Sequence, residues 1–309
     1  MQQYSLLLFY ILLLSYNYPL LSGIKINEKM FSQKLKLPQC IVNNKNKVKY
    51  CGHEVTNFVL NEQPELNKKK LITISPGGFK GFYMLGIVSY IKAYYDLPKE
   101  EYIFSGSSAG AWNALVMTYK GDGDYLFKMM YEIVREINKD FKKGSILTMQ
   151  IKLRNMILNN FCEDDFALDN LFIGITHFRY FIPHTTIYTG FDSLSDAIDC
   201  CMASSHIPVL TGDIMNKYRG LNAFDGGFSK YPYLNLINPV LEIKPSIWNS
   251  ALLPCIPPPK FYKNKYNPTP KCIEEFTTLF SKNIYDLVEL FELGFLDTFE
   301  NKHILDSIF

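Results

Sequence analysis

A serine stands between two glycines in the stretch Gly106-Ser107-Ser108-Ala109-Gly110. This spacing suits a sharp turn from a strand into a helix, because glycine lacks the Cβ atom that would clash at such a turn. Ser108 would then present its hydroxyl at the apex, where it could attack an ester carbonyl as a nucleophile. On its own the motif is only moderately specific, since glycine and serine also form ordinary turns.

A glycine-rich segment, Pro76-Gly77-Gly78-Phe79-Lys80-Gly81, lies upstream of this serine. In such a loop, backbone N–H groups can converge on one point at a helix N-terminus and bind an anion. The segment matches neither a Walker loop nor a dinucleotide fingerprint. An ester hydrolase needs donors of this kind for the oxygen that becomes negative during attack. The alternative is an inert tight turn.

Asp225, in the stretch Asp225-Gly226-Gly227, offers a carboxylate that could act as the general base. By itself Asp-Gly is a common hairpin turn. The chain has 5 histidines, and a Ser–Asp–His arrangement in that order would have to use His303. A carboxylate that acts directly on Ser108 needs no histidine, but it must lie within hydrogen-bond distance of the Ser108 Oγ.

Two short apolar strands are predicted to position these motifs. Leu71–Ile74 leads into the glycine-rich loop and then into a helix over Phe82–Tyr95. Glu101–Phe104 leads into the serine turn and a buried helix that starts at Ala111. In a parallel sheet covered by helices, these strands would be neighbours and would place the loop beside Ser108.

The downstream pattern continues the alternation of strands and helices. We predict an amphipathic helix over Tyr125–Asn138, a strand over Thr185–Gly190, a helix from its Ser193 cap to about Ser205, a long proline-rich loop over Pro239–Pro270, and a final helix with Ile273 to Phe291 on one face. The catalytic domain is therefore expected to cover residues 71–300, with an α/β fold.

Residues 1–22 form a hydrophobic segment that we expect to be a signal peptide or a membrane anchor. Its uninterrupted run, Leu6–Leu14, has the length of a signal-peptide core and is short for a spanning helix. The first lysines of the chain follow this run, which favours an anchor with the catalytic domain in the cytosol. Cleavage of the segment would instead give a secreted protein. Residues 23–70 read as a polar extension, irregular apart from a short strand at Val55–Leu60.

Composition excludes several other classes of protein. The 309 residues carry a formal net charge of +2, with no basic stripe, so we expect no nucleic-acid partner. The 7 cysteines show no metal-ligand spacing, and we expect neither a metal nor a cofactor. Cys200 and Cys201 are expected to be buried thiols. Cys40 and Cys51 are close enough in sequence for a local disulfide in an oxidising compartment.

Taken together, the three motifs resemble those of the patatin-like phospholipase family. That family combines a glycine-rich oxyanion loop, a GxSxG turn and an Asp-Gly-Ala/Gly motif around a Ser–Asp dyad. The resemblance implies that Ser108 is the nucleophile and Asp225 the proton acceptor. It also implies an oxyanion hole from Gly77, Gly78, Phe79, Lys80 and Gly81, with Gly106, Gly110, Gly226 and Gly227 as the other motif glycines.

Two further segments support the resemblance and one residue departs from it. Ala203–Pro208 resembles the family's Ala-Ser-x-x-Ile-Pro segment, and Gly294–Asp297 resembles a Gly-aromatic-x-Asp stretch. Pro76 replaces the first loop glycine, which removes one backbone N–H. The resemblance covers roughly residues 71–297. It implies a three-layer α/β/α fold with a mostly parallel central sheet.

The resemblance also implies an activity. We expect hydrolysis of the acyl esters of phospholipids or related lipids through an acyl-serine intermediate, without a cofactor, on lipid presented by a membrane surface. Three alternatives stay open at this stage: a lipid acyltransferase on the same fold, a Ser–Asp–His hydrolase that uses His303, and a membrane-tethered lipid-binding protein with little or no catalysis.

Overall fold

The computed structural model describes residues 48–51, 66, 68–179, 182–229, 232–234, 239–248 and 285–309. In these ranges a six-stranded sheet has the order β1-β5-β4-β3-β2-β8. Its strands are β1 (Val48–Cys51), β2 (Lys70–Ile74), β3 (Tyr102–Ser107), β4 (Leu171–Arg179), β5 (Ile182–Tyr188) and β8 (Leu241–Ile243). β8, β2, β3 and β4 run parallel, whereas β5 and β1 pair antiparallel. The predicted α/β class with a mostly parallel central sheet is therefore confirmed.

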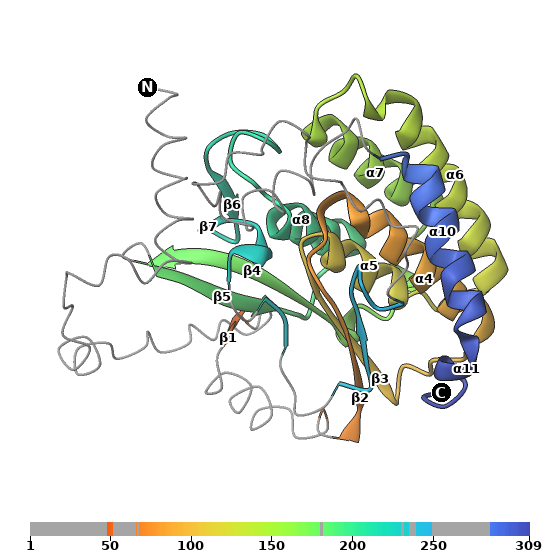
Figure 1. The fold of residues 1–309 in the computed structure, drawn as a ribbon. Coiled ribbons are helices and arrows are strands. Elements are labelled where there is room, and N and C mark those ends of the chain that lie inside the picture. The colour runs from red at the N-terminus through yellow and green to blue at the C-terminus, as the bar shows by residue number, and fades with distance from the viewer. Residues whose placement is uncertain are drawn as a thin grey trace, which may run out of the picture.

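Helices flank this sheet (Figure 1). They are α4 (Gly81–Tyr94), α5 (Ala109–Met117), α6 (Gly123–Phe141), α7 (Ile146–Asn160), α8 (Leu194–Ser204), α10 (Leu287–Glu300) and α11 (Lys302–Leu305). A two-stranded hairpin, β6 (Asn216–Tyr218) and β7 (Leu221–Ala223), forms a separate small sheet. Short 3-10 turns include η3 (Gly78–Lys80), η4 (Glu163–Asp165), η5 (Leu168–Asn170) and η6 (Gly226–Phe228).

The two faces of the sheet carry different amounts of apolar packing. Ile72 and Ile74 of β2 belong to a large buried cluster that includes residues of α4, α5, α6 and α10. Leu71 and Ile103 belong to a smaller cluster on the alternate positions of the strands, completed by Leu66, Phe172, Ile187 and Leu234. Because successive strand residues point to opposite faces, both faces of the central strands are apolar, as expected for parallel strands covered on both sides.

The contact between α4 and α10 explains the Gly-aromatic-x-Asp segment. A Cβ at Gly294 would lie 1.9 Å from the carbonyl oxygen of Tyr83, and one at Gly86 would lie 2.0 Å from that of Phe291. The two glycines therefore let the helix backbones approach closely. The hydroxyl of Tyr83 donates to Oδ2 of Asp297 at 2.6 Å. These residues hold α4 and α10 together and do not line the cavity that contains Ser108.

Several predicted boundaries differ from the structure. α6 begins at Gly123, because the Asp122 side chain accepts the N–H of Tyr125 as its cap, and it ends at Phe141 rather than Asn138. The final helix was wrongly predicted to be continuous up to Phe291. α10 begins at Leu287, where Asp286 caps the backbone N–H groups of Val288 and Glu289.

The segment before β2 was predicted to be irregular at Val48–Cys51, but these residues form strand β1, which pairs with β5 at the edge of the sheet. The predicted helix from the Ser193 cap is confirmed: α8 ends at Ser204, and the Ser193 side chain accepts the N–H of Asp196. Cys200 and Cys201 are buried free thiols, as expected.

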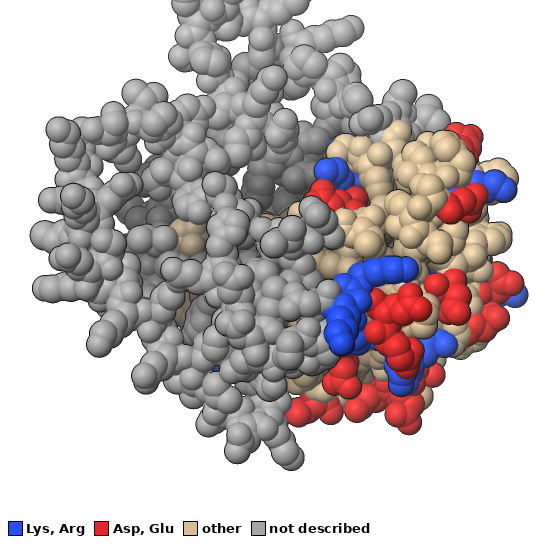
Figure 2. Space-filling model, turned by 90° about the horizontal axis from the view of Figure 1, so that it is seen from below, with Lys and Arg blue, Asp and Glu red and all other residues tan. Residues whose placement is uncertain are grey.

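Other expectations fall outside the described residues. These include the hydrophobic segment 1–22, the strand at Val55–Leu60, the pairing of Cys40 with Cys51, and most of the Pro239–Pro270 loop. Within the described part of the chain, every helix is too short or too polar to cross a bilayer. On the face seen in Figure 2, the basic and acidic side chains of the described residues lie next to one another.

Candidate active site

The turn between β3 and α5 has the geometry that the glycine spacing predicts. Ser108 adopts φ 55° and ψ −128°, a strained combination for a residue with a side chain. A Cβ at Gly106 would lie 2.0 Å from the carbonyl oxygen of Gly110. One at Gly110 would lie 2.1 Å from the carbonyl oxygen of Ile74. Both glycines are therefore required by close backbone approach, and the turn presents Ser108 at the carboxyl end of the sheet.

Asp225 reaches the same place from a distant part of the sequence. Phe224 exchanges two backbone hydrogen bonds with Thr176 of β4, at 2.9 and 3.1 Å. The N–H of Asp225 donates to the carbonyl oxygen of His206, which follows α8, at 2.7 Å. These contacts hold the backbone on both sides of the carboxylate, so strand β4 and the end of α8 determine where Asp225 lies.

The two predicted residues contact each other directly. The Ser108 hydroxyl donates to Oδ2 of Asp225 at 2.5 Å, and the N–H of Gly227 donates to Oδ1 at 2.7 Å. Ser108 and Asp225 are only 4% and 5% exposed. Gly226 cannot carry a side chain, because its Cβ would lie 1.8 Å from Ser107 Oγ. The structure thus brings Ser108 and the Asp-Gly-Gly motif together.

Burial controls the protonation of Asp225. Removal from water raises the pKa of the carboxyl group from 3.8 to about 7, although the hydrogen bonds from Ser108 and Gly227 act in the opposite direction. A group with this pKa can both accept and return a proton near neutral pH. The Ser108–Asp225 pair can therefore work as a nucleophile and a general base.

The raised pKa makes folding stability depend on pH. Between about pH 4 and 7 the native chain holds a proton on Asp225 that the unfolded chain has lost, so stability falls as pH rises through this window. Asp225→Asn abolishes this titration. We expect the variant to exceed the wild type in free energy of unfolding at pH 8, by at most about 4 kcal/mol. The difference should shrink towards zero near pH 4.

Urea unfolding at several pH values measures this difference. A gain that does not change with pH would contradict a carboxyl group whose burial raises its pKa, since asparagine would then be acting through packing alone.

The glycine-rich loop lies beside the serine turn, as predicted. Ile74 pairs with Gly106 in the parallel register of β2 and β3, which brings the following residues of both strands together. Gly78 has φ 52° and lines the same cavity as Ser108. The ring of Pro76 lies next to the base motif, because a Cβ at Gly227 would be 3.2 Å from the Pro76 Cβ.

Two of the five predicted oxyanion residues use their N–H groups elsewhere. The N–H of Lys80 donates to the carbonyl oxygen of Gly77 at 3.0 Å, and that of Gly81 donates to those of Gly78 and Phe79. These bonds form the η3 turn and the start of α4. Gly81 also has a packing role, because its Cβ would lie 2.6 Å from that of Ala109.

One residue that positions the site was not identified from the sequence. The Asn113 side chain donates to the carbonyl oxygens of Gly81 and Ala109, at 3.0 and 3.1 Å, and is 3% exposed. It therefore ties the glycine-rich loop to the serine turn. A polar side chain within the apolar start of α5 was the available signal. His303, by contrast, lies exposed on α11, whereas Asp225 contacts Ser108 directly.

An apolar cavity extends from the Ser108–Asp225 pair into the helical layer. Its empty space amounts to about 800 Å³ when the open mouth is included. Its apolar walls come from four helices and η3. They comprise Phe79, Phe82, Leu85, Trp112, Val116, Met130, Ile133, Val134, Ile146, Met149, Leu153 and Ile157.

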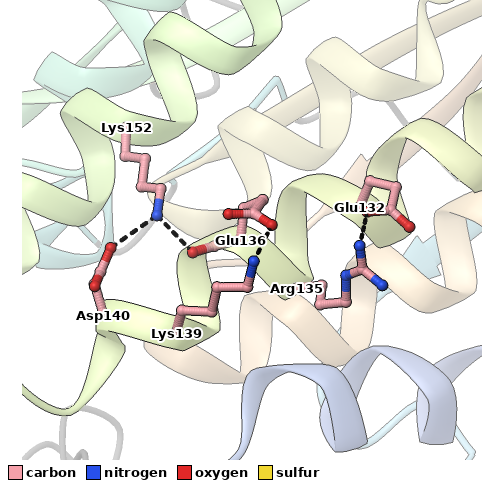
Figure 3. A network of polar contacts seen from close by, with 6 residues as sticks. All are labelled: Glu132, Arg135, Glu136, Lys139, Asp140 and Lys152. Atoms are coloured by element: carbon pink, nitrogen blue, oxygen red, sulfur yellow. Dashed lines mark hydrogen bonds and ion pairs between the residues drawn. The ribbon is translucent and has the colours of Figure 1, made fainter.

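Polar contacts hold α7 in place as one wall of this cavity. Figure 3 shows Lys152 of α7 reaching back to α6, where it donates to the carbonyl oxygen of Glu136 and to Asp140 at 2.6 and 2.8 Å. On the other side, Arg154 donates to Asp199 and Ser195 of α8, both at 2.9 Å. Helix α7 is therefore fixed to both neighbouring helices by side chains that do not line the cavity.

Among the described residues, no cluster of three or more histidine, cysteine, aspartate or glutamate side chains could hold a metal ion. The Ser108 hydroxyl and the Asp225 carboxylate line the cavity, beside the backbone N–H groups of the glycine-rich loop.

Comparison with known proteins gives two matches. A family model described as patatin-like phospholipase matches residues 72–237. A human omega-hydroxyceramide transacylase is 26% identical over 164 residues, which cover 51% of this chain. The aligned stretch spans only 30% of the human protein. No solved structure gives a significant match.

Proposed function

Because this chain belongs to the patatin-like phospholipase family, we propose that it cleaves acyl esters of phospholipids or related lipids through an acyl-serine on Ser108. One observation carries the proposal: the Ser108 hydroxyl donates to the buried Asp225 carboxylate at 2.5 Å, at the base of an apolar cavity. A nucleophile, a base with a pKa of about 7 and an apolar space for the acyl chain are what acyl transfer from a lipid requires.

In the first step, Ser108 Oγ attacks the ester carbonyl carbon while Asp225 takes the hydroxyl proton. The carbonyl oxygen becomes negative and is bound by backbone N–H groups of the glycine-rich loop, in which Gly78 lines the cavity. The C–O bond to the lipid alcohol then breaks, and protonated Asp225 returns the proton to the leaving oxygen. The fatty acyl group remains on Ser108 as an ester.

In the second step, Asp225 takes a proton from water as the water attacks the acyl-serine. The bond to Ser108 Oγ breaks, the serine oxygen regains the proton, and the fatty acid leaves. The same carboxyl group thus serves both half-reactions, and no histidine is required. The direct 2.5 Å contact between Asp225 and Ser108 supports this arrangement over one that uses the exposed His303.

A fluorophosphonate probe tests the proposal, because it forms a covalent bond only with an activated serine. We expect the wild-type chain to be labelled at Ser108, as located by peptide mass spectrometry. The labelling rate should increase as pH rises through about 7, where Asp225 loses its proton. Lack of labelling and of esterase turnover would instead favour a lipid-binding protein without catalysis.

The apolar walls support a fatty acyl chain as the occupant of the cavity. Apart from Gln150, Asn113, Ser205 and Thr211, the side chains around the Ser108–Asp225 pair are apolar. Burial of a methylene group in such a space is worth about 0.8 kcal/mol. Long acyl chains should therefore be preferred over short ones.

Narrowing the cavity should weaken that preference. Leu153 of α7 lines it and is only half buried, so Leu153→Trp places bulk in the cavity without overpacking a fully enclosed site. We expect the ratio of kcat/KM for p-nitrophenyl palmitate to that for the butyrate to fall at least about 10-fold. Leu158→Trp is the matched control, because Leu158 lies on the same helix, is also half buried and does not line the cavity. Equal ratios in the two variants would argue against the cavity as the acyl site.

Transfer of the acyl group to an alcohol is a second candidate function. It is favoured by the similarity to a human protein named as a transacylase, although the aligned stretch covers 30% of that protein. Both reactions share the acyl-serine and differ in the acceptor of the second step. Incubation with a labelled lipid ester and an added long-chain alcohol separates them, since hydrolysis gives free fatty acid and transfer gives a new ester.

Membrane association is part of the proposal. The hydrophobic composition of residues 1–22 supports a signal or anchor, followed by a polar extension over residues 23–70 and a catalytic domain over residues 71–300. Flotation of the full chain with vesicles, compared with a chain that lacks residues 1–22, tests whether this segment provides the attachment.

A further inference from the structure

We propose that Ser204 is a positioning residue that fixes the backbone of the nucleophile, Ser108. The inference rests on the proposed function, because it concerns the same Ser108. It goes further, since Ser204 neither contacts the acyl cavity nor belongs to the Ser108–Asp225 pair.

The geometry around Ser204 is a two-bond bridge. The backbone N–H of Ser108 donates to Ser204 Oγ at 2.8 Å, and the Ser204 hydroxyl donates to the carbonyl oxygen of Gly174 at 2.6 Å. Ser204 is fully buried at the end of α8. One hydroxyl therefore satisfies a donor on the serine turn and an acceptor on β4, both out of reach of water.

The bridge stands where two strands separate. Ser107 is the last residue of β3 and pairs with Gly174 of β4. At Ser108 the chain turns away from the sheet into α5. The next backbone N–H thus loses its place in the strand pairing, and the Ser204 hydroxyl replaces the missing strand partner. A buried N–H without a partner is rare in folded proteins because it carries a desolvation cost.

Strand β4 is also the strand that holds the base. Thr176 lies two residues beyond Gly174 and forms both backbone hydrogen bonds to Phe224, next to Asp225. Through Ser204, the backbone of the nucleophile is tied to the same strand. The separation of Ser108 and Asp225 is therefore set by contacts that both end on β4.

The bridge also limits where the oxyanion can bind. In some serine hydrolases the N–H of the nucleophile itself is one of the oxyanion donors. Here that N–H points to Ser204 instead, so it is occupied before substrate arrives. The oxyanion donors must then come from elsewhere, and the loop around Gly78 lines the same cavity.

A purely structural role for Ser204 would be to anchor α8, but α8 has other anchors. Asp199 and Ser195 accept from Arg154, and Asp196 accepts from the Tyr218 hydroxyl at 2.8 Å. Loss of the Ser204 hydroxyl should leave α8 in place and release only the serine turn.

Ser204→Ala tests the inference, with Ser105→Ala as the matched control. Ser105 is also fully buried and its Oγ accepts a backbone N–H, that of Leu234, at 2.9 Å. It lies within β3, outside the turn and the cavity. Both variants thus leave a buried N–H without its partner, but only one does so at the nucleophile.

We expect Ser204→Ala to lower kcat and the fluorophosphonate labelling rate together, by about 10- to 100-fold, with KM within about twofold. Labelling should still reach the same final extent as in the wild type, because the folded fraction is intact. Ser105→Ala should lose similar stability to urea and keep both rates within about threefold. A reduced extent of labelling at an unchanged rate would overturn the inference, because it is the signature of a structural role.

Equal values of kcat and of the labelling rate in Ser204→Ala and Ser105→Ala would also overturn the inference. If Ser204→Ala does not fold, Ser204→Cys retains a weak donor and acceptor on a slightly larger side chain of the same shape, and the same comparison with Ser105→Ala decides. Absence of labelling in the wild type would instead reject the proposed function itself, and this inference with it.

Discussion

Replacing Ser108 with alanine, or Asp225 with asparagine, is expected to lower kcat for acyl-ester hydrolysis by about 10⁴-fold or more. Alanine removes the atom that forms the acyl-enzyme. Asparagine keeps the shape and can retain the bond from the Gly227 N–H to its oxygen, but it cannot accept the serine proton. Initial rates with a p-nitrophenyl ester, together with fluorophosphonate labelling, measure both losses.

The double variant sharpens this expectation. Because the serine and the carboxylate act as one unit, the double variant should lose no more kcat than either single variant does. Losses that multiply in the double variant would show that Asp225 acts on something other than the Ser108 proton.

A buried aspartate outside the site supplies the control. Asp297 is 8% exposed, accepts from the Tyr83 hydroxyl and does not line the cavity. Asp297→Asn should therefore change stability while kcat stays within a few-fold of the wild type. Near-normal turnover in Asp225→Asn would contradict the proposed mechanism. If kcat fell equally in Asp297→Asn, the loss would come from replacing any buried carboxylate and not from the position of Asp225.

The parts of the site that the sequence predicts are those fixed over short distances. Gly106 and Gly110 must be glycines because their backbones lie against the backbone of the same turn or of the neighbouring strand. Their spacing around Ser108 is therefore enough to predict the turn. The β2–loop–α4 and β3–turn–α5 units are likewise local. This is why both loops, and their place side by side, could be predicted.

The contacts that place the base are long-range and were not visible in the sequence. Asp225 is 117 positions from Ser108, and its location depends on pairing of Phe224 with β4. β4 itself escaped prediction. The Asp-Gly-Gly motif identified the residue through its resemblance to a family, whereas the strand that holds it emerged only from the structure.

The predicted helix boundaries were wrong where polar side chains determine the residue at which a helix begins. The apolar spacing up to Phe291 predicted an uninterrupted helix, but Asp286 accepts two backbone N–H groups and begins α10 one residue later. Asn138 adds to this by bonding Asp286 and the N–H of Leu287. α7 escaped prediction because only Ile146, Gln150 and Ile157 of its 15 residues are buried, so its apolar periodicity is weak.

Gly78→Ala should lower kcat by about 100- to 1,000-fold with little change in KM, the usual effect of losing one oxyanion donor. Gly78 has φ 52°, a conformation that alanine adopts only with strain, so the loop should rotate and redirect its N–H groups away from the cavity. Because the oxyanion exists only during attack, this change should affect the chemical step rather than ground-state binding.

The control must separate backbone strain from the lost donor. Gly220 also has positive φ, 81°, in the β6–β7 hairpin, and a Cβ there would meet no atom within 4 Å. Gly220→Ala therefore imposes comparable strain outside the cavity and should leave kcat within about threefold of the wild type. If Gly78→Ala also kept near-normal kcat while folding normally, the oxyanion could not depend on the conformation of this loop. With the Ser108 N–H already bonded to Ser204, the donors would then have to be sought at the start of α5.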